Sequence, residues 1–150
     1  MNFTILPASK QHAAGIFQLI NALALFERAP EEVTLTLSQF EEDGFGPNPA
    51  WKALVAVDEA QNVIGFALWY LRYSTWKGRR LYLEDLYVEE GWRRAGVATA
   101  LMLALREEAQ KAACNGMVWQ VLDWNEGAKR FYEKLGAYFD AGWENVSMPV

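Results

Sequence analysis

The sequence has few residues of the types that build disulfides and metal sites. Its 150 residues include one cysteine, Cys114, and one histidine, His12. A single cysteine forms no internal disulfide, and no second thiol or histidine cluster offers a zinc site, so we expect no bound metal. Because disulfides are typical of oxidising compartments, this scarcity favours a reduced, cytoplasmic setting.

Two further absences concern membranes and nucleic acids. No run of about 18 apolar residues occurs, and the opening segment MNFTILPASK has no basic start followed by an apolar stretch, so we expect no membrane association. Basic residues are in the minority, with 14 Lys and Arg against 19 Asp and Glu. The formal charge of -5 argues against nucleic acid as a partner and suits cationic ligands.

Apolar residues, by contrast, are plentiful. Hydrophobic residues make up 52% of the chain and aromatic residues 14%. A chain of this length and composition has ample material for one hydrophobic core, and no repeat or linker interrupts it. We therefore expect a single domain over residues 1–150.

The spacing of apolar residues predicts the order of strands and helices. The expected elements are a strand at 3–6, a helix from about residue 11 that ends at Pro30, an irregular connection with one helical turn at 31–49, a hairpin of strands at 51–57 and 63–73, a strand at 81–88, a helix at 98–113, a strand at 117–121 and a helix at 127–135. The apolar stripe of the helix at 98–113 is Val97, Leu101, Leu105 and Ala112. This order predicts a mixed α/β sheet rather than an all-parallel nucleotide-binding fold.

The turn from Arg93 to Ala98 follows a predicted strand and opens a predicted helix. Its small residues let backbone N–H groups approach an anion, and the helix start adds about half a positive charge. Arg93 and Arg94 add full charges. The pattern predicts phosphate binding, although Gly96 also fits such a turn for backbone reasons alone. No triphosphate or dinucleotide loop motif is present.

Three motifs together resemble a known family. The turn has the form Arg93-x-x-Gly96-x-Ala98, residues 81–88 read LYLEDLYV, and residues 124–137 read WNEGAKRFYEKLGA. In this order and spacing they resemble the pyrophosphate loop, upstream strand and late helix of the GNAT acetyltransferase superfamily. The segments at 26–27, 42–46 and 63–67 extend the resemblance to its spermidine/spermine and thialysine acetyltransferase branch.

The resemblance implies a GNAT-like acyl-CoA N-acyltransferase fold with a mixed α+β sheet. It further implies acetyl-CoA as co-substrate, the primary amine of a small molecule as acceptor, and a homodimer. The positions that it marks for acetyl-CoA binding are Leu86, Tyr87, Val88, Arg93, Arg94, Ala95, Gly96, Val97, Ala98, Thr99, Asn125 and Ala128. The positions that it marks for the acceptor are Phe26, Glu27, Trp76, Asp85 and Trp143.

Two positions match the catalytic residues of this branch. Glu84 matches the base that takes the proton of the amine, directly or through water, and Tyr132 matches the acid that protonates the leaving thiolate. The residues alone also allow other roles, because Glu84 can form a salt bridge to Arg79 or Arg80 and Tyr132 can be a core or interface residue.

The reaction needs a base such as Glu84, because the ammonium form of the acceptor must lose a proton before its nitrogen can attack the thioester. The apolar neighbours of Glu84 should make the ionised carboxylate costly to bury, which favours a proton acceptor. In a regular strand, however, Glu84 shares a face with Tyr82 and Leu86, whereas Asp85 points to the opposite face. We therefore expect the two acids to act separately.

Some positions depart from the branch pattern. Ser74 and Ala141 stand where polyamine-specific relatives carry acids, and Arg94 replaces a glycine that is usual in the loop. These departures disfavour long polyamines and leave thialysine-like amino acids, diamines and other aminoalkyl compounds. Two alternative functions stay open: acetylation of a protein N-terminus or lysine, which needs an open groove, and a non-catalytic acyl-CoA sensor.

Overall fold

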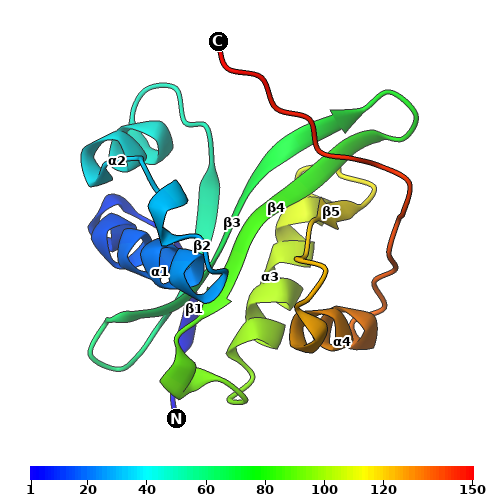
Figure 1. The fold of residues 1–150 in the computed structure, drawn as a ribbon. Helices are drawn as coiled ribbons and strands as arrows, with labels where there is room; N and C mark the ends of the chain where they lie inside the picture. The colour runs from blue at the N-terminus through cyan, green and yellow to red at the C-terminus, as the bar shows by residue number, and fades with distance from the viewer. The chain divides into compact units, whose positions relative to one another are not determined.

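The computed structural model describes all residues from 1 to 150, and they form two compact units (Figure 1). The first unit spans Met1–Trp119 and the second spans Gln120–Val150. The first unit contains a five-stranded sheet, and the second contains one helix and an extended C-terminal segment.

The sheet is mixed, as the sequence predicts. Its strands are β1 (Thr4–Pro7), β2 (Lys52–Val57), β3 (Val63–Ser74), β4 (Gly78–Val88) and β5 (Met117–Trp119), and they lie side by side in chain order. The first four strands pair antiparallel, and β5 joins β4 in parallel. β4 begins three residues earlier, and β5 ends two residues earlier, than the predicted strands.

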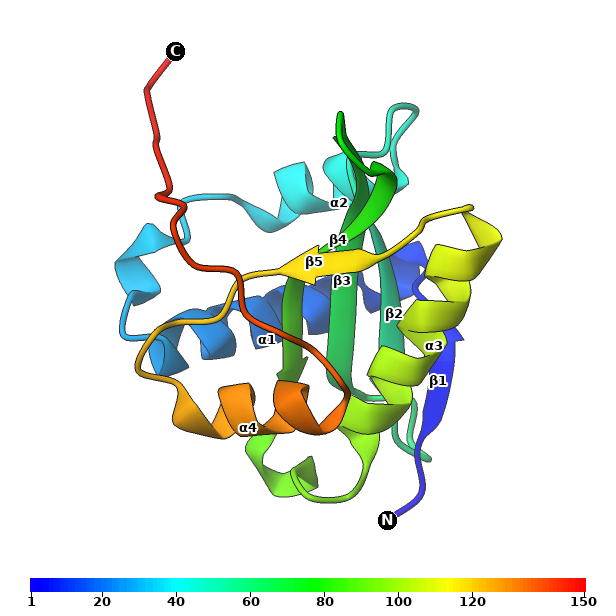
Figure 2. The same cartoon turned by 90° about the vertical axis from the view of Figure 1, so that its right-hand side faces the viewer.

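Helices cover both faces of this sheet. α1 (Ala13–Phe26) and α2 (Leu37–Phe45) lie on one side and α3 (Val97–Lys111) on the other, which Figure 2 shows with α3 in front of the strands and α1 behind them. Short 3-10 turns at Lys10–His12, Pro30–Glu32 and Glu90–Trp92 connect these elements. None of the helices is both long and apolar enough to cross a bilayer.

Two predictions about the helices are wrong in detail. α1 ends at Phe26 rather than at Pro30, because Arg28 adopts a positive φ of 65° that no helix accommodates. Pro30 instead begins the next 3-10 turn. In α3 the buried stripe continues from Leu105 to Ala109, whereas Ala112 lies just beyond the end of the helix.

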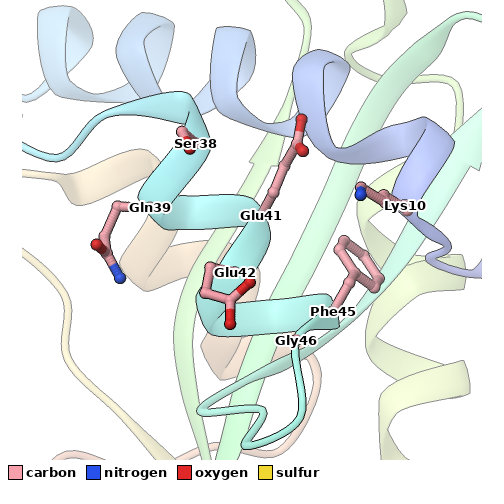
Figure 3. A pocket seen from close by; sticks show the side chains of 7 residues that line it. All are labelled: Lys10, Ser38, Gln39, Glu41, Glu42, Phe45 and Gly46. Carbon is pink, nitrogen blue, oxygen red and sulfur yellow. The ribbon is translucent and has the colours of Figure 1, made fainter.

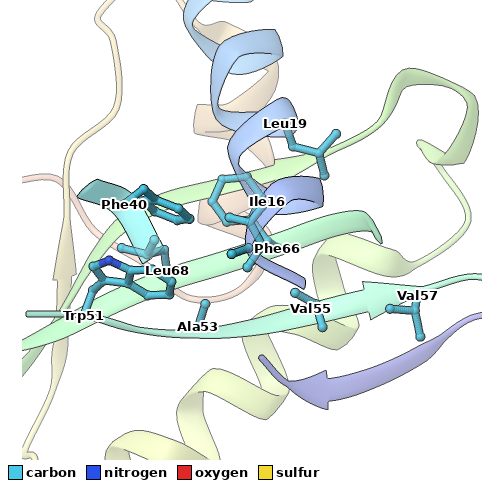
Figure 4. Packing of buried hydrophobic residues seen from close by; sticks show 10 residues of the cluster. Ile16, Leu19, Phe40, Trp51, Ala53, Val55, Val57, Phe66 and Leu68 are labelled. Atoms are coloured by element: carbon cyan, nitrogen blue, oxygen red, sulfur yellow. The ribbon is translucent and has the colours of Figure 1, made fainter. Parts of the chain in front are cut away.

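The core under α1 is formed by alternate residues of the central strands (Figure 4). Because side chains alternate across a strand, one face of β2 and β3 packs against α1 and α2. The buried members of this cluster are Ala13, Ile16, Leu19, Phe40, Trp51, Ala53, Val55, Val57, Phe66 and Leu68. The rings of Phe40 and Trp51 stack with centroids 4.5 Å apart, and Phe45 meets Trp51 edge-on at 5.2 Å.

A register shift in the β3–β4 ladder changes which residues share a face. Leu68 pairs with Asp85, but the next residue, Trp69, pairs with Leu83, so Glu84 is an extra residue on β4. Such a bulge keeps consecutive residues on one face. The prediction that Glu84 and Asp85 face opposite sides is therefore wrong.

The contact between β4 and β5 is short. Parallel pairing runs only from Leu81 to Leu83, where Leu83 meets Trp119. From Glu84 to Val88 the edge of β4 on that side has no strand partner. Backbone N–H and C=O groups that point to this edge are therefore available to a ligand.

The second unit contains α4 (Glu126–Lys134). Asn125 caps its start, because the Oδ1 atom of Asn125 accepts a hydrogen bond from the backbone N–H of Ala128 at 3.1 Å. Gly136, with φ of 90°, follows its end, which is the position where a left-handed residue closes a helix. Residues 137–150 contain no helix or strand.

Candidate active site

Glu84 and a pair of tyrosines form the exposed part of the site. The hydroxyl of Tyr70 donates a hydrogen bond to Oε1 of Glu84 at 2.9 Å. The ring of Tyr70 stacks on that of Tyr82 with centroids 5.2 Å apart. Glu84 is exposed rather than surrounded by apolar neighbours, and it forms no salt bridge to Arg79 or Arg80.

The buried acid of the site is Asp85. Burial, together with the smaller effect of the negative charges of Glu84 and Glu27, raises the pKa of Asp85 to about 7. Glu27 follows the last residue of α1, and burial raises the pKa of Glu27 as well. The end of α1 and the bulge of β4 therefore bring three carboxyl groups within electrostatic reach of one another.

Arg93 joins the end of α1 to the end of β4. Its guanidinium carbon lies 5.4 Å from the centre of the Phe26 ring and 5.6 Å from the centre of the Tyr87 ring. Its Nε also donates a hydrogen bond to the carbonyl of Val88 at 3.3 Å. Both rings favour a cation over their faces, so Arg93 links the acceptor side of the site to the predicted phosphate turn.

The turn before α3 has the geometry that anion binding requires. Gly96 precedes the helix with φ of 85°, and no side chain caps the first backbone N–H groups of α3. No atom lies within 4 Å of the position that a Cβ on Gly96 would take, so the space before the helix is open. Arg94 has φ of 63°, which explains why a glycine is usual there.

The pyrophosphate and arm of a coenzyme A ester fit these two features. The open N-terminus of α3, from Val97 to Thr99, offers unpaired N–H groups to phosphate oxygens. The unpaired edge of β4 from Leu86 to Val88 offers backbone partners to the amide groups of a pantetheine arm, apart from the Val88 carbonyl, which accepts the hydrogen bond from Arg93. Ala95 and Ala98 are small enough to leave that approach open.

The remaining predicted site residues belong to the β3–β4 turn and to the second unit. Trp76 lies in the β3–β4 turn, eight residues before Glu84 in the chain, and its side chain is exposed. Asn125, Ala128, Tyr132 and Trp143 belong to the second unit. There Tyr132 is buried on α4 and Trp143 is exposed.

A shallow hollow lies beside α2. It has a volume of about 350 Å³ and is lined by Lys10 and by one side of α2 from Ser38 to Gly46 (Figure 3). None of the predicted site residues lines it. Because it lies away from the turn before α3 and from β4, we assign it no part in the site.

Two residues on the Glu84 face were missed at the sequence level, namely Tyr70 and Arg72, whereas Tyr82 was expected on that face. The guanidinium of Arg72 lies over the Tyr82 ring, 5.4 Å from its centre. Alternation along 63–73 places Tyr70 and Arg72 on one face, but only the register with β4 shows that this face also carries Glu84.

Comparisons with known proteins agree with this geometry. The sequence model of the Acetyltransferase (GNAT) family matches residues 15–137, which extend across both units. The chain is 37% identical over 145 residues to thialysine N-epsilon-acetyltransferase of Bos taurus, a match that covers 91% of this chain and 85% of that protein. It is 33% identical over 150 residues to the human spermidine/spermine N(1)-acetyltransferase-like protein 1, covering 94% of this chain and 22% of that protein.

A solved structure shows the same fold. An integron cassette protein of V. cholerae superposes with a TM-score of 0.80 at 21% identity, covering 100% of this chain and 94% of that chain. The family match and the relatives named as acetyltransferases lead to one conclusion. The chain belongs to the Acetyltransferase (GNAT) family and is an acetyl-CoA-dependent N-acetyltransferase.

Proposed function

We propose that the protein transfers the acetyl group of acetyl-CoA directly to the primary amine of a small molecule. The observation that carries this proposal is the β-bulge of β4, which puts Glu84 and Asp85 on one face beside the unpaired strand edge. An acceptor amine that binds there meets two carboxyl groups and stands next to the edge that suits the pantetheine arm.

The first step is removal of a proton from the ammonium form of the acceptor. Glu84 takes this proton at the exposed end of the site, and Tyr70 orients its carboxylate through the hydrogen bond to Oε1. Asp85 and Glu27 bind the cationic acceptor. Because the pKa of Asp85 is about 7, its charge develops as the pH rises through neutrality, where the acceptor also becomes easier to deprotonate.

The second step is attack of the neutral amine on the thioester that acetyl-CoA supplies. Backbone N–H groups on the unpaired edge of β4 stabilise the negative charge that develops on the acetyl oxygen. Because the amine attacks directly, no nucleophilic side chain is needed. Cys114, beyond the end of α3, has no part in this reaction.

The last step is protonation of the coenzyme A thiolate by Tyr132 of α4. Asn125 and Ala128 at the start of the same helix contact the coenzyme. What supports these roles is the match of residues 124–137 to the family pattern and the family match across residues 15–137. We accordingly propose that both units work as one acetyltransferase domain over residues 1–150.

The acceptor is a thialysine-like amino acid, a diamine or a polyamine. The relatives named above act on thialysine or bear the name of spermidine and spermine, which are all small molecules with a primary amine. Phe26 lies beside Glu27 at the end of α1 and supplies an aromatic ring near the carboxyl groups. Trp76 and Trp143 remain proposed contacts for the acceptor.

The test is turnover of acetyl-CoA, followed by release of free thiol, with thialysine, lysine, diamines, spermidine and a lysine-containing peptide. Acetylation of one or more small amines, with product confirmed by mass spectrometry, supports the proposal. Acetylation of the peptide alone would replace it with protein acetylation. Binding of coenzyme A without any turnover would indicate a sensor.

A further inference from the structure

The turn before α3 holds two arginines, and the structure gives their side chains different surroundings. The guanidinium of Arg93 lies over the rings of Phe26 and Tyr87. Its Nε donates a hydrogen bond to the carbonyl of Val88, so this side chain turns back toward α1 and β4. Arg94 is exposed and forms no salt bridge or side-chain hydrogen bond. Arg94 is therefore the cation of this turn that is available to an anion.

The backbone at Arg94 has a conformation that suits glycine. Its φ of 63° lies in the left-handed region, where a Cβ atom adds steric strain. Three other residues share this conformation, namely Arg28, Gln61 and Ala113. Two of them close the ends of α1 and α3, where a left-handed residue is common, and Gln61 lies in the turn between β2 and β3. Arg94 alone precedes a helix, and its side chain makes no hydrogen bond or ion pair that would offset the strain, which indicates a role for the side chain in binding.

The space in front of α3 suits the phosphate end of coenzyme A. The turn lies at the lower end of α3 in Figure 2, and no atom lies within 4 Å of the position that a Cβ on Gly96 would take. The first backbone N–H groups of α3 have no side-chain cap, so they suit the pyrophosphate. Coenzyme A also carries a phosphate monoester at the 3′ position of its ribose. That group remains for a side chain to bind.

A guanidinium group is a suitable partner for this phosphate monoester. The monoester carries a charge of about −1.5 to −2 at pH 7. Arginine binds phosphate oxygens through parallel N–H groups and keeps its charge at every physiological pH. Glu89 and Glu90 are exposed just before the turn and would repel a phosphate, so a full positive charge on the same turn is needed to offset them.

We propose that the side chain of Arg94 binds the 3′-phosphate of coenzyme A and is retained in the turn for this contact despite the backbone strain. The inference rests on the acetyl-CoA dependence of the family and not on the identity of the acceptor. It makes the protein selective for coenzyme A over 3′-dephospho-coenzyme A. A glycine at the same position would leave the backbone groups that suit the pyrophosphate but would offer nothing to the 3′-phosphate.

The first test measures the dissociation constants of coenzyme A and 3′-dephospho-coenzyme A by titration calorimetry. The wild type should bind coenzyme A about tenfold more tightly, the size of one charge-assisted hydrogen bond. Arg94→Gln should weaken coenzyme A binding about tenfold and change binding of the dephospho form less than about twofold. Arg94→Lys keeps the charge and should keep part of the preference. A wild type without the preference, a preference that survives Arg94→Gln, or equal weakening of both coenzymes overturns the inference.

The second test separates the side chain from the strain. Arg94→Gly removes both, so its melting temperature without coenzyme should rise by about 2–4 °C while its affinity for coenzyme A falls as in Arg94→Gln. Gln61→Gly is the matched control, because Gln61 has a similar φ of 67° in a turn away from α3. It should gain stability and leave coenzyme A affinity unchanged. An Arg94→Gly variant that is less stable than the wild type, or that keeps full affinity, contradicts the proposed reason for the arginine.

Both tests measure binding and stability rather than turnover, so their outcomes are independent of the acceptor. A protein that prefers coenzyme A over its dephospho form through Arg94 but acetylates no small amine would keep the inference and lose the proposed function. A protein that acetylates small amines with either coenzyme equally well bound would keep the function and lose the inference. Circular dichroism of each variant shows whether it is folded.

Discussion

At the scale of single residues, the pKa of Asp85 links the chemistry of the site to the stability of the fold. Burial first, and then the charges of Glu84 and Glu27, raise this pKa to about 7 from an ordinary value of 3.8. Between those two pH values the folded protein holds a proton that the unfolded chain has released. Stability therefore falls as pH rises from about 4 to about 7, and the full cost remains above pH 7.

Asp85→Asn removes that cost, because an amide has no charge to bury. We predict that its melting temperature, relative to that of the wild type, rises as the pH is raised from 4 to 8. Asp58→Asn should instead be less stable than the wild type by a nearly constant amount over this range, because hydrogen bonds from Asn62 lower the pKa of Asp58 and the resulting stabilisation is lost only as the pH falls below the ordinary value of 3.8. Scanning calorimetry across this pH range measures both, and a difference for Asp85→Asn that does not grow with pH would contradict the account.

A second residue-scale feature is the contact between Gly44 and Trp51. A Cβ on Gly44 would stand 2.1 Å from an atom of the Trp51 ring, which is itself stacked on Phe40. Only glycine fits at this point of α2. Packing against Trp51 therefore explains the presence of Gly44 in the 42–46 motif without a catalytic role for that glycine.

We predict that Gly44→Ala lowers the free energy of unfolding by about 1–3 kcal/mol, the usual cost of an overpacked core. Gly127→Ala in α4 is the control, because only Oδ1 of Asn125 comes within 4.0 Å of the new methyl group. That change should be neutral or stabilising by about 0.5–1 kcal/mol, since alanine favours a helix. Urea denaturation gives both values, and an unchanged stability for Gly44→Ala would show that the core can move aside.

At the scale of helices and strands, apolar periodicity predicts which elements form but not the bulge. The strand at 81–88 and the helix that follows it were predictable from spacing and turn residues. The extra residue at Glu84 was not, because it arises from the register between β3 and β4, which local sequence does not define. That one-residue shift is the reason why Glu84 and Asp85 lie on one face against expectation.

The same limit applies to residues that act across elements. Arg93 was predictable as part of a phosphate turn, whereas its position between Phe26 and Tyr87 depends on the packing of α1 against β4. Tyr70 and Arg72 carry no local motif, so no sequence signal distinguishes them from other strand residues.

We predict that Arg93 and Phe26 act as a pair. Arg93→Gln should weaken coenzyme A binding and raise the KM of the acceptor, and the effect should be smaller when Phe26 is already alanine. A coupling of about 0.5–2 kcal/mol is expected for a cation over an aromatic ring. Arg94→Gln is the control, since it removes the same charge from the same turn. Equal coupling of Phe26 to both arginines would show that binding depends on the net charge of the turn and not on the contact between Arg93 and Phe26.

At the scale of the whole molecule, residues 138–150 expose many apolar side chains. Tyr138, Phe139, Trp143, Val146 and Met148 are all at least 48% exposed. Exposed apolar surface of this kind is typical of an interface between subunits, and we therefore propose the homodimer that the family resemblance implies.

We predict that light scattering gives twice the mass of one chain at micromolar concentration. Tyr138→Ser combined with Val146→Ser should shift the mass toward that of a single chain. A circular dichroism spectrum like that of the wild type would show that the variant is folded. A monomeric wild type at these concentrations would contradict the homodimer and leave the site within one chain unaffected.

The central claim is that Glu84 removes the proton of an amine bound beside acetyl-CoA. Its most direct test is Glu84→Gln, with thiol release measured on the best acceptor and coenzyme A binding measured by calorimetry. The account predicts a loss of about 100-fold or more in kcat with coenzyme A affinity unchanged. A variant that keeps its turnover would contradict the role of Glu84, and one that loses coenzyme A binding would show that the residue supports the coenzyme site instead.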